Sequence, residues 1–179
     1  IAAEVVVVEP GEALPADGSL YLLGGGEDNA QTTAVRELTR DGTVFRAVEN
    51  GAVVFAVCAG YQICGQTFTI GENDEVRGGL GVLGVTTRPG AERAVGEILT
   101  RWPRPDGSEY VLTGFENHGG YTYLGSDAAP LAHVEKGVGN AGDGTEGAVQ
   151  GRVIGTYPHG PVLARNPAPA DHLLELALA

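Results

Sequence analysis

The sequence predicts an α/β fold built on a parallel sheet. One observation is a set of short, uninterrupted apolar runs rich in Val and Leu, which are typical of strands buried on both faces. The other is that helix-compatible stretches separate these runs in the first half of the chain, as in β-α-β-α units. The middle of the chain is richer in glycine and charge, and there the sequence predicts shorter strands.

The expected elements follow in order along the chain. Strands of the parallel sheet are predicted at Val5–Val8, Leu20–Leu23, Val53–Val57 and Arg152–Thr156. Helices are predicted at Asp28–Arg40, Val44–Glu49, Ala59–Thr67 and Pro167–Leu178, the last with Asn166 as its N-cap. Shorter strands are predicted at Ala94–Thr100, Tyr110–Phe115, Tyr121–Leu124 and Leu131–Val134, with a glycine-rich loop at Gly137–Gly147.

Composition narrows the class of protein. A length of 179 residues without a recognisable linker predicts one domain over residues 1–179, and a net charge of −12 argues against a nucleic-acid partner. No apolar run approaches the ~20 residues of a membrane-spanning helix, and no signal peptide is visible. The chain contains no Met and begins at Ile1, so we expect it to lack its natural start.

The chain has two cysteines, Cys58 and Cys64, without the Cys/His pairs of a zinc site. We therefore expect no metal and no disulfide framework, and a reducing cytosol is the default location. Cys58 stands where the apolar run Val53–Val57 stops and a helix-compatible stretch begins, among small residues. This pattern predicts a nucleophile elbow, with the thiol at a helix N-terminus that lowers its pKa. The alternative is an ordinary buried cysteine in a core strand.

A cysteine nucleophile needs a base, and the chain has four candidates: His118, His133, His159 and His172. His159 is preferred, because it follows the strand predicted at Arg152–Thr156 just as Cys58 follows its own. In an open parallel sheet, groups beyond the carboxyl ends of strands meet in one crevice. The alternative for His159 is a surface loop histidine, and His118 either lines the site or caps a glycine-rich turn.

An acyl-enzyme route also needs donors for an oxyanion. Gly24-Gly25-Gly26 ends the strand at Leu20–Leu23 and offers backbone N–H groups without side chains in the way. By the logic of the elbow, the N–H of Ala59 is the second donor. The alternative is a flexible or phosphate-binding loop, but the spacing does not match a dinucleotide fingerprint, and Glu27 and Asp28 oppose an anion.

At this point the motifs resemble those of class I glutamine amidotransferases, in the CobB/CobQ-like branch that includes cobyric acid synthase. Within that branch they are most similar to the glutaminase subunits of lipid II isoglutaminyl synthase, the GatD type. The motifs are Gly24-Gly25-Gly26-Glu27-Asp28-Asn29-Ala30-Gln31, Cys58-Ala59-Gly60-Tyr61-Gln62, Phe115-Glu116-Asn117-His118-Gly119-Gly120 and Gly155-Thr156-Tyr157-Pro158-His159-Gly160-Pro161. The resemblance implies a flavodoxin-like three-layer sandwich, with a mostly parallel central sheet and an antiparallel β extension, that lacks a native N-terminal strand and helix here.

The resemblance also implies roles for the matched positions. Cys58 would attack the side-chain amide of L-glutamine, and His159 would be its base. Gly25 or Gly26, together with Ala59, would bind the oxyanion. Two further residues would bind the substrate: Gln62 at its backbone end, and Arg93 as the arginine that selects glutamine. A guanidinium suits this task because it grips a carboxylate in a bidentate manner.

The resemblance further implies a partner. Ammonia would pass to a Mur-ligase-like, MurT-type subunit in a heterodimer, which amidates D-glutamate of lipid II in peptidoglycan biosynthesis. ATP and Mg²⁺ are expected on that partner, because this chain contains no G-x-x-x-x-G-K-[ST] loop. The location would be cytoplasmic, near the inner membrane face but without insertion into it.

One departure from the family pattern concerns the base. Many class I enzymes carry His-x-Glu, whereas Gly160-Pro161 follows His159 here, so no carboxylate orients the base from that position. We expect the partner to donate an aspartate. Three other functions stay open: an amidotransferase for cobyrinate or cobyric acid, a non-catalytic scaffold subunit, and a flavodoxin-like binding module.

Overall fold

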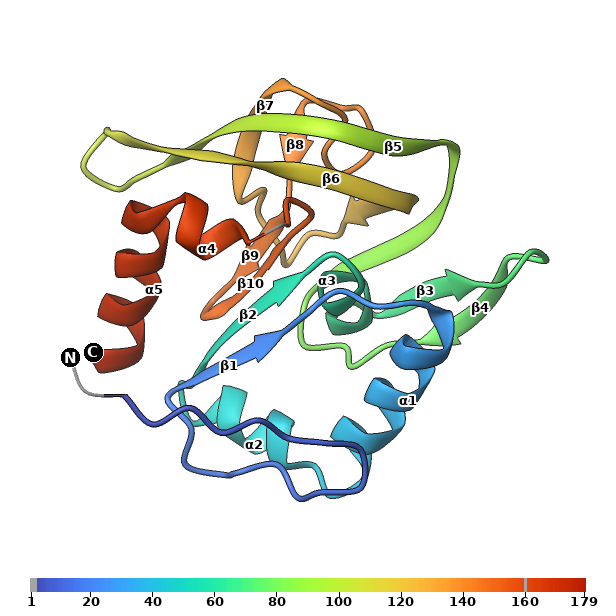
Figure 1. Cartoon of the computed structure of the whole chain (residues 1–179), viewed down its shortest axis with the longest axis vertical. Coiled ribbons are helices and arrows are strands. Elements are labelled where there is room, and N and C mark those ends of the chain that lie inside the picture. The colour runs from blue at the N-terminus through green and yellow to red at the C-terminus, as the bar shows by residue number, and fades with distance from the viewer. Residues whose placement is uncertain (1–2, 160) are drawn as a thin grey trace.

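Four short strands form the sheet that carries Cys58. The computed structural model describes residues 3–159 and 161–179, and these strands lie in the order β1, β2, β10 and β9 (Figure 1). The first three are parallel, and β9 is antiparallel at the edge. Their bounds are Leu20–Leu23 for β1, Val53–Val57 for β2, Val153–Thr156 for β10 and Ala148–Gln150 for β9.

Helices cover both faces of this sheet. One face packs against α1, α2 and α3 and includes the side chains of Val54, Ala56 and Val153. The other face packs against α4, α5 and the second sheet. The helices span Asp28–Thr39 (α1), Thr43–Glu49 (α2), Ala59–Cys64 (α3), Val162–Arg165 (α4) and Pro167–Leu178 (α5). Because side chains alternate along a strand, the continuous apolar run of β2 supplies both layers.

The second sheet is built around a long antiparallel hairpin that crosses over the first sheet (Figure 1). Its strands are β5 (Val85–Pro103) and β6 (Glu109–Leu124), and their pairing shifts register between Pro89 and Ala94. The strand order of this sheet is β4-β3-β5-β7-β8, and β6 pairs with β5 outside that order. The remaining strands span Thr67–Ile70 (β3), Glu75–Gly78 (β4), Ala132–Lys136 (β7) and Thr145–Glu146 (β8).

The predicted α/β fold, with a mostly parallel central sheet and an antiparallel extension, is confirmed. The strands at Leu20–Leu23 and Val53–Val57 and the helix at Pro167–Leu178 have the predicted bounds. The strand at Arg152–Thr156 and the helices α1 and α2 agree within a residue. Among the described residues, no helix combines the length and the apolar character needed to cross a bilayer.

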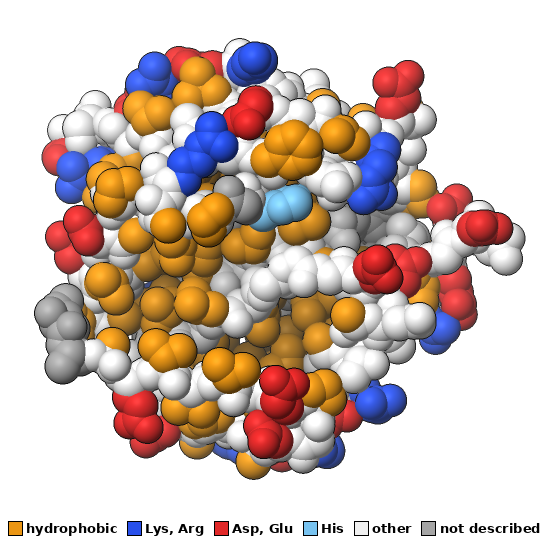
Figure 2. Space-filling model, viewed as in Figure 1, with side chains coloured by type: hydrophobic (Ala, Val, Ile, Leu, Met, Phe, Trp, Pro, Cys, Tyr) orange, Lys and Arg blue, Asp and Glu red, His pale blue; other side chains and the backbone are white. Residues whose placement is uncertain are grey.

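The buried strand predicted at Val5–Val8 is wrong. This segment has no strand pairing, and the exposed fraction of Val5 is 84%. An apolar, β-branched run becomes a buried strand only where a neighbouring strand and a covering layer are available, and the described chain supplies neither here. Hydrophobic side chains also gather in a hollow between α5 and β1 (Figure 2), and Leu22 on β1 is 60% exposed.

The middle of the chain is more regular than the sequence predicts. The strands expected at Ala94–Thr100, Tyr110–Phe115 and Tyr121–Leu124 are parts of the two long strands β5 and β6. The helix after Cys58 ends at Cys64, because Gly65 is extended. Strands β3, β4, β8 and β9 and helix α4 were not predicted, since short elements that depend on a partner strand leave little periodic signal.

Candidate active site

Cys58 lies on a strained turn between β2 and α3. Its φ of 53° and ψ of −108° belong to a region that non-glycine residues rarely occupy. Such a turn needs small neighbours: a Cβ on Gly60 would come within 2.5 Å of the carbonyl oxygen of Leu23. The backbone N–H of Gly60 instead donates to the carbonyl oxygen of Gly24, at 3.1 Å. The elbow is therefore joined directly to the glycines that follow β1.

The thiol of Cys58 faces β6. Its Sγ lies 4.0 Å from the carbonyl oxygen of Asn117, in a half-buried position. Burial raises the pKa of this thiol, although the Ala59 backbone N–H and the positive charge of Arg93 act to lower it. The prediction that the helix N-terminus lowers the pKa of Cys58 is therefore wrong. Desolvation disfavours the thiolate more than these two neighbours favour it.

His159 leaves the neighbouring strand at the same end of the sheet. It follows β10, and its backbone pairs with Phe115 of β6 through two hydrogen bonds of 3.1 and 3.2 Å. Burial and the nearby His118 lower the pKa of His159, which keeps its imidazole neutral at neutral pH. Its Nε2 is enclosed and makes no hydrogen bond within residues 3–159 and 161–179, to the Cys58 thiol or to any carboxylate.

The glycines after β1 border the nucleophile. A Cβ on Gly25 would lie 3.7 Å from the Cβ of Cys58, so this backbone runs alongside the elbow. Gly26 lies one residue further, beside Ala30 at the start of α1. Ala59 is buried directly after Cys58, and its backbone N–H interacts with the thiol. These three positions can present backbone donors to an oxyanion near Cys58.

Arg93 reaches the same place from β5, at the edge of the site. Its Nε donates to Oδ1 of Asn117 at 2.8 Å, and its Nη2 lies 3.5 Å from the carbonyl oxygen of Asn117. The same carbonyl oxygen faces the Cys58 thiol. An exposed guanidinium beside a nucleophile can bind a substrate carboxylate and add positive charge to the site.

Gln62 is held inside the protein. Its Oε1 accepts a hydrogen bond of 2.7 Å from Nε2 of Gln31 on α1, and its Nε2 donates to the hydroxyl of Tyr157 at 3.3 Å. This side chain therefore joins α1, α3 and the segment before His159. Each of its polar atoms makes one hydrogen bond to the protein, which fixes the side-chain amide and leaves one N–H and one oxygen lone pair for a substrate.

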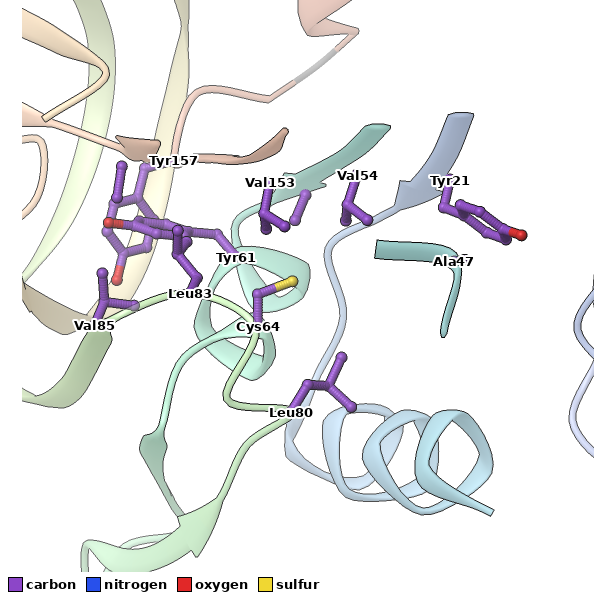
Figure 3. Packing of buried hydrophobic residues seen from close by; sticks show 12 residues of the cluster. Tyr21, Ala47, Val54, Tyr61, Cys64, Leu80, Leu83, Val85, Val153 and Tyr157 are labelled. Atoms are coloured by element: carbon purple, nitrogen blue, oxygen red, sulfur yellow. The ribbon is translucent and has the colours of Figure 1, made fainter. Parts of the chain in front are cut away.

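A polar layer lies beneath the site, centred on Tyr157. The Tyr157 hydroxyl is within 2.6 Å of Thr122 Oγ1 and donates to the carbonyl oxygen of Gly120 at 2.9 Å. The Tyr157 ring meets that of Tyr61 edge to face, with centroids 5.2 Å apart (Figure 3). On its other side it stacks on His118 at 3.6 Å. These contacts hold the chain immediately before His159.

His118 belongs to this layer rather than to a turn. It lies within β6, is 2% exposed, and its Nδ1 is 2.8 Å from the carbonyl oxygen of Gly120. Its Nε2 faces Oε2 of Glu116 at 3.6 Å. Burial acts to raise the pKa of Glu116, but His118 and the hydrogen bonds from the backbone N–H groups of Val138 and Gly139, at 2.7 and 2.9 Å, lower it overall. The alternative in which His118 caps a glycine-rich turn is wrong, because the turn that it assumed is a paired strand.

A second buried carboxylate, that of Glu146, holds the end of β10. It accepts hydrogen bonds from the backbone N–H of Tyr157 at 2.7 Å and from Oγ1 of Thr156 at 3.0 Å. Complete burial raises the pKa of Glu146 to about 7. This residue therefore ionises close to neutral pH, at the base of the segment that leads to His159.

Two residues of this site were missed in the sequence: Asn117 and Tyr157. A usable signal was present for Asn117, since alternation in a strand places it on the opposite face from Glu116 and His118. That signal requires knowing that the motif is a strand. No comparable local signal was available for Tyr157, whose partners come from three different elements, α3, β6 and β8.

The comparisons with known proteins point to the same family as the sequence motifs do. Residues 2–167 match the family described as CobB/CobQ-like glutamine amidotransferase domain. The chain is 35% identical to the Staphylococcus aureus lipid II isoglutaminyl synthase (glutamine-hydrolyzing) subunit GatD, over 99% of this chain and 71% of that protein. It is also 35% identical to the Streptococcus pneumoniae GatD subunit, over 89% of this chain and 61% of that protein.

A further relative is cobyric acid synthase from Brucella abortus, 35% identical over 89% of this chain and 32% of that protein. Two solved structures share the fold. A chain from the structure of PurLQS from Thermotoga maritima has a TM-score of 0.67 at 18% identity, covering 96% of this chain and 83% of its own. A glutamine amidotransferase from the same organism has a TM-score of 0.53 at 19% identity, covering 88% and 64%.

Proposed function

This chain belongs to the CobB/CobQ-like glutamine amidotransferase domain family, and on that premise we propose that it hydrolyses L-glutamine at Cys58 and passes the ammonia to a partner ligase. One observation carries the proposal. Cys58, on its strained turn, lies between the glycines that follow β1 and the Arg93–Asn117 pair. A nucleophile, backbone donors and a positive charge that can bind a carboxylate therefore lie close together.

In the proposed first step, Sγ of Cys58 attacks the carbonyl carbon of the glutamine side-chain amide. The thiol proton moves to Nε2 of His159, whose lowered pKa keeps the imidazole neutral and able to accept it. The N–H groups of Ala59 and of Gly25 or Gly26 stabilise the oxyanion. Because the thiol and His159 are not hydrogen-bonded in the substrate-free protein, a rotation of the thiol away from Asn117 must accompany attack.

The intermediate then collapses. The carbon–nitrogen bond breaks, and the proton on His159 transfers to the departing nitrogen, which leaves as ammonia. A γ-glutamyl thioester remains on Cys58. Water attacks this thioester with His159 as base, and the proton returns to the sulfur as glutamate leaves. The chemistry consumes one water and needs no metal ion from this chain.

We propose that the acceptor is the D-glutamate of the lipid II stem peptide, amidated with ATP by a Mur-ligase-like, MurT-type partner in a heterodimer. Support comes from the 35% identity to two GatD subunits of lipid II isoglutaminyl synthase. ATP and Mg²⁺ would bind to that partner, and peptidoglycan synthesis would be the process served. The protein would then act in the cytoplasm, close to the lipid-bound acceptor at the inner membrane face.

The partner would also complete the active site. In the part of the chain that the structure describes, Nε2 of His159 makes no hydrogen bond to a carboxylate, so no acid there orients the base as one does in a triad. We propose that the partner donates an aspartate to His159. Full glutaminase activity of the isolated chain would refute this part of the proposal.

The deciding experiment is mass-mapped labelling with a diazo analogue of glutamine, with and without the ligase. We expect an adduct on Cys58 and none on Cys64, whose thiol is fully buried. Labelling that requires the ligase supports a site completed across the interface. Cys58→Ser serves as the control. If the folded chain gains no adduct in either condition, the protein is a non-catalytic scaffold.

A further inference from the structure

We propose that Asn117 is the positioning residue that gives this site its preference for glutamine, because it holds the guanidinium of Arg93 beside Cys58. This role rests on the proposed function, in which Arg93 binds the α-carboxylate of the substrate. Asn117 contacts both partners: its Oδ1 accepts from Arg93 Nε at 2.8 Å, and its carbonyl oxygen lies 4.0 Å from Cys58 Sγ.

The contact with Asn117 leaves the end of the Arg93 guanidinium that carries Nη1 open to a substrate. Asn117 engages the side of Arg93 that carries Nε and Nη2, through its side-chain and backbone oxygens. The end that carries Nη1 and Nη2 can still grip a carboxylate with two parallel hydrogen bonds. Gly119 lies next to Nη1, where a Cβ would be 3.6 Å away, and its lack of a side chain keeps that end accessible.

Asn117 can act as a fixed brace because both of its neighbours in the chain are anchored. Glu116 and His118 are each 2% exposed and point to the buried face of β6. Glu116 accepts two backbone hydrogen bonds from the segment between β7 and β8, and His118 stacks on the ring of Tyr157. Alternation along the strand then directs Asn117 to the opposite face, toward the site.

Arg93 needs such a brace. It is exposed and lies within the register shift between Pro89 and Ala94, so regular strand pairing does not hold its backbone. A free arginine side chain samples many rotamers, and a substrate that had to order it would bind more weakly. Asn117 orders Arg93 before the substrate arrives. Its loss should therefore weaken recognition of the carboxylate while the thiol still reacts.

The experiment compares two reagents at Cys58 in the full chain, with the ligase present if wild-type labelling requires it. The diazo glutamine analogue carries an α-carboxylate, whereas iodoacetamide does not. We expect Asn117→Ala to lower the ratio of the two labelling rates about tenfold, the effect of losing one hydrogen bond to a charged group. Val111→Ala, on the same exposed face of β6 but without a contact to Arg93, should leave the ratio unchanged.

A double-mutant comparison separates bracing from a general structural effect. We expect Arg93→Ala to lower the ratio at least as far, and the double variant R93A/N117A to be no worse than R93A alone. If Asn117→Ala does not fold, Asn117→Ser replaces it, because its side chain is too short to reach Arg93 Nε. If the ratio for Asn117→Ala stays within twofold of wild type, or if the losses add in the double variant, the role of Asn117 is overturned but the proposed function is not. Absence of diazo labelling on the wild-type protein overturns the proposed function as well.

Discussion

The backbone N–H of Cys58 donates a hydrogen bond of 2.8 Å to the carbonyl oxygen of Thr156. This bond extends the ladder between β2 and β10 by one residue, to the point where each strand ends. Cys58 follows β2 directly, and His159 follows Thr156 by three residues. The nucleophile and its candidate base therefore leave neighbouring parallel strands at the same end, where α/β sheets bind their ligands.

Replacement of Gly60 by alanine tests the elbow. The new Cβ would come within 2.5 Å of the carbonyl oxygen of Leu23 and 2.9 Å of that of Gly24. We expect Gly60→Ala to lower the free energy of unfolding by about 1–3 kcal/mol and to abolish diazo labelling, because the strand-end glycines must move. Urea denaturation measures the first effect. Gly78→Ala is the control, since a Cβ there meets nothing within 4 Å, and equal stability of the two variants would contradict the packing.

The pH dependence of thiol alkylation tests the environment of Cys58. Since burial raises its pKa, the rate with iodoacetamide should still be rising at a pH where a free cysteine, with a pKa of about 8.5, has levelled off. Arg93→Ala should move the profile to still higher pH, because the positive charge that favours the thiolate is lost. Cys64, whose pKa burial raises to about 12, should stay unmodified in the folded protein. A profile that levels off below pH 8 would be inconsistent with this environment.

Glu146 should make stability depend on pH. Its pKa rises from 4.5 to about 7 on folding, so the folded protein holds a proton that the unfolded chain releases in that range. Its contribution to stability is therefore complete below about pH 4.5 and is lost as pH rises through about 7. We expect Glu146→Gln to remove this part of the decline, because an amide can still accept from the Tyr157 N–H. Thermal unfolding from pH 5 to 8 measures the difference, and parallel curves for the two proteins would rule out the shift.

The Asn166 side chain should stabilise the fold by binding the backbone of β6. Its side chain accepts from the N–H of Thr113 at 2.9 Å and donates to the carbonyl oxygens of Thr113 and Val162, both at 2.7 Å. We expect Asn166→Ala to cost about 2 kcal/mol in unfolding free energy, since buried backbone groups lose their partners. Asn166→Asp should be no better, because a carboxylate cannot donate. Asn73→Ala, at an exposed position, is the control. If Asn166→Ala loses no more unfolding free energy than Asn73→Ala, the hydrogen bonds of Asn166 are dispensable.

Asn166 also shows where local sequence reasoning ends. The sequence predicts a helix that begins with Asn166 and Pro167, and helix α5 does begin at Pro167. However, the Asn166 side chain makes no capping hydrogen bond and binds Thr113 on β6 instead. A helix start is a local property of a few adjacent residues, whereas the partner of a buried amide depends on which distant strand packs beside it.

The sequence by itself determined the strand, turn and helix around Cys58, because a buried apolar run, small residues and helix-forming residues act over short range. It also determined that the glycines Gly24–Gly26 follow the end of a strand, and that another strand precedes His159. It did not determine the fate of Val5–Val8, since an apolar run needs a neighbouring strand to become part of a sheet.

Only the tertiary structure decided the surroundings of the nucleophile. The Asn117–Arg93 pair and the buried layer around Tyr157 join residues from strands that are distant in sequence. The direction in which the pKa of the Cys58 thiol shifts was decided in the same way, because burial outweighs the local N–H of Ala59. Desolvation and hydrogen bonding depend on every atom within a few ångströms, and the folded chain supplies those atoms from segments that no local pattern connects.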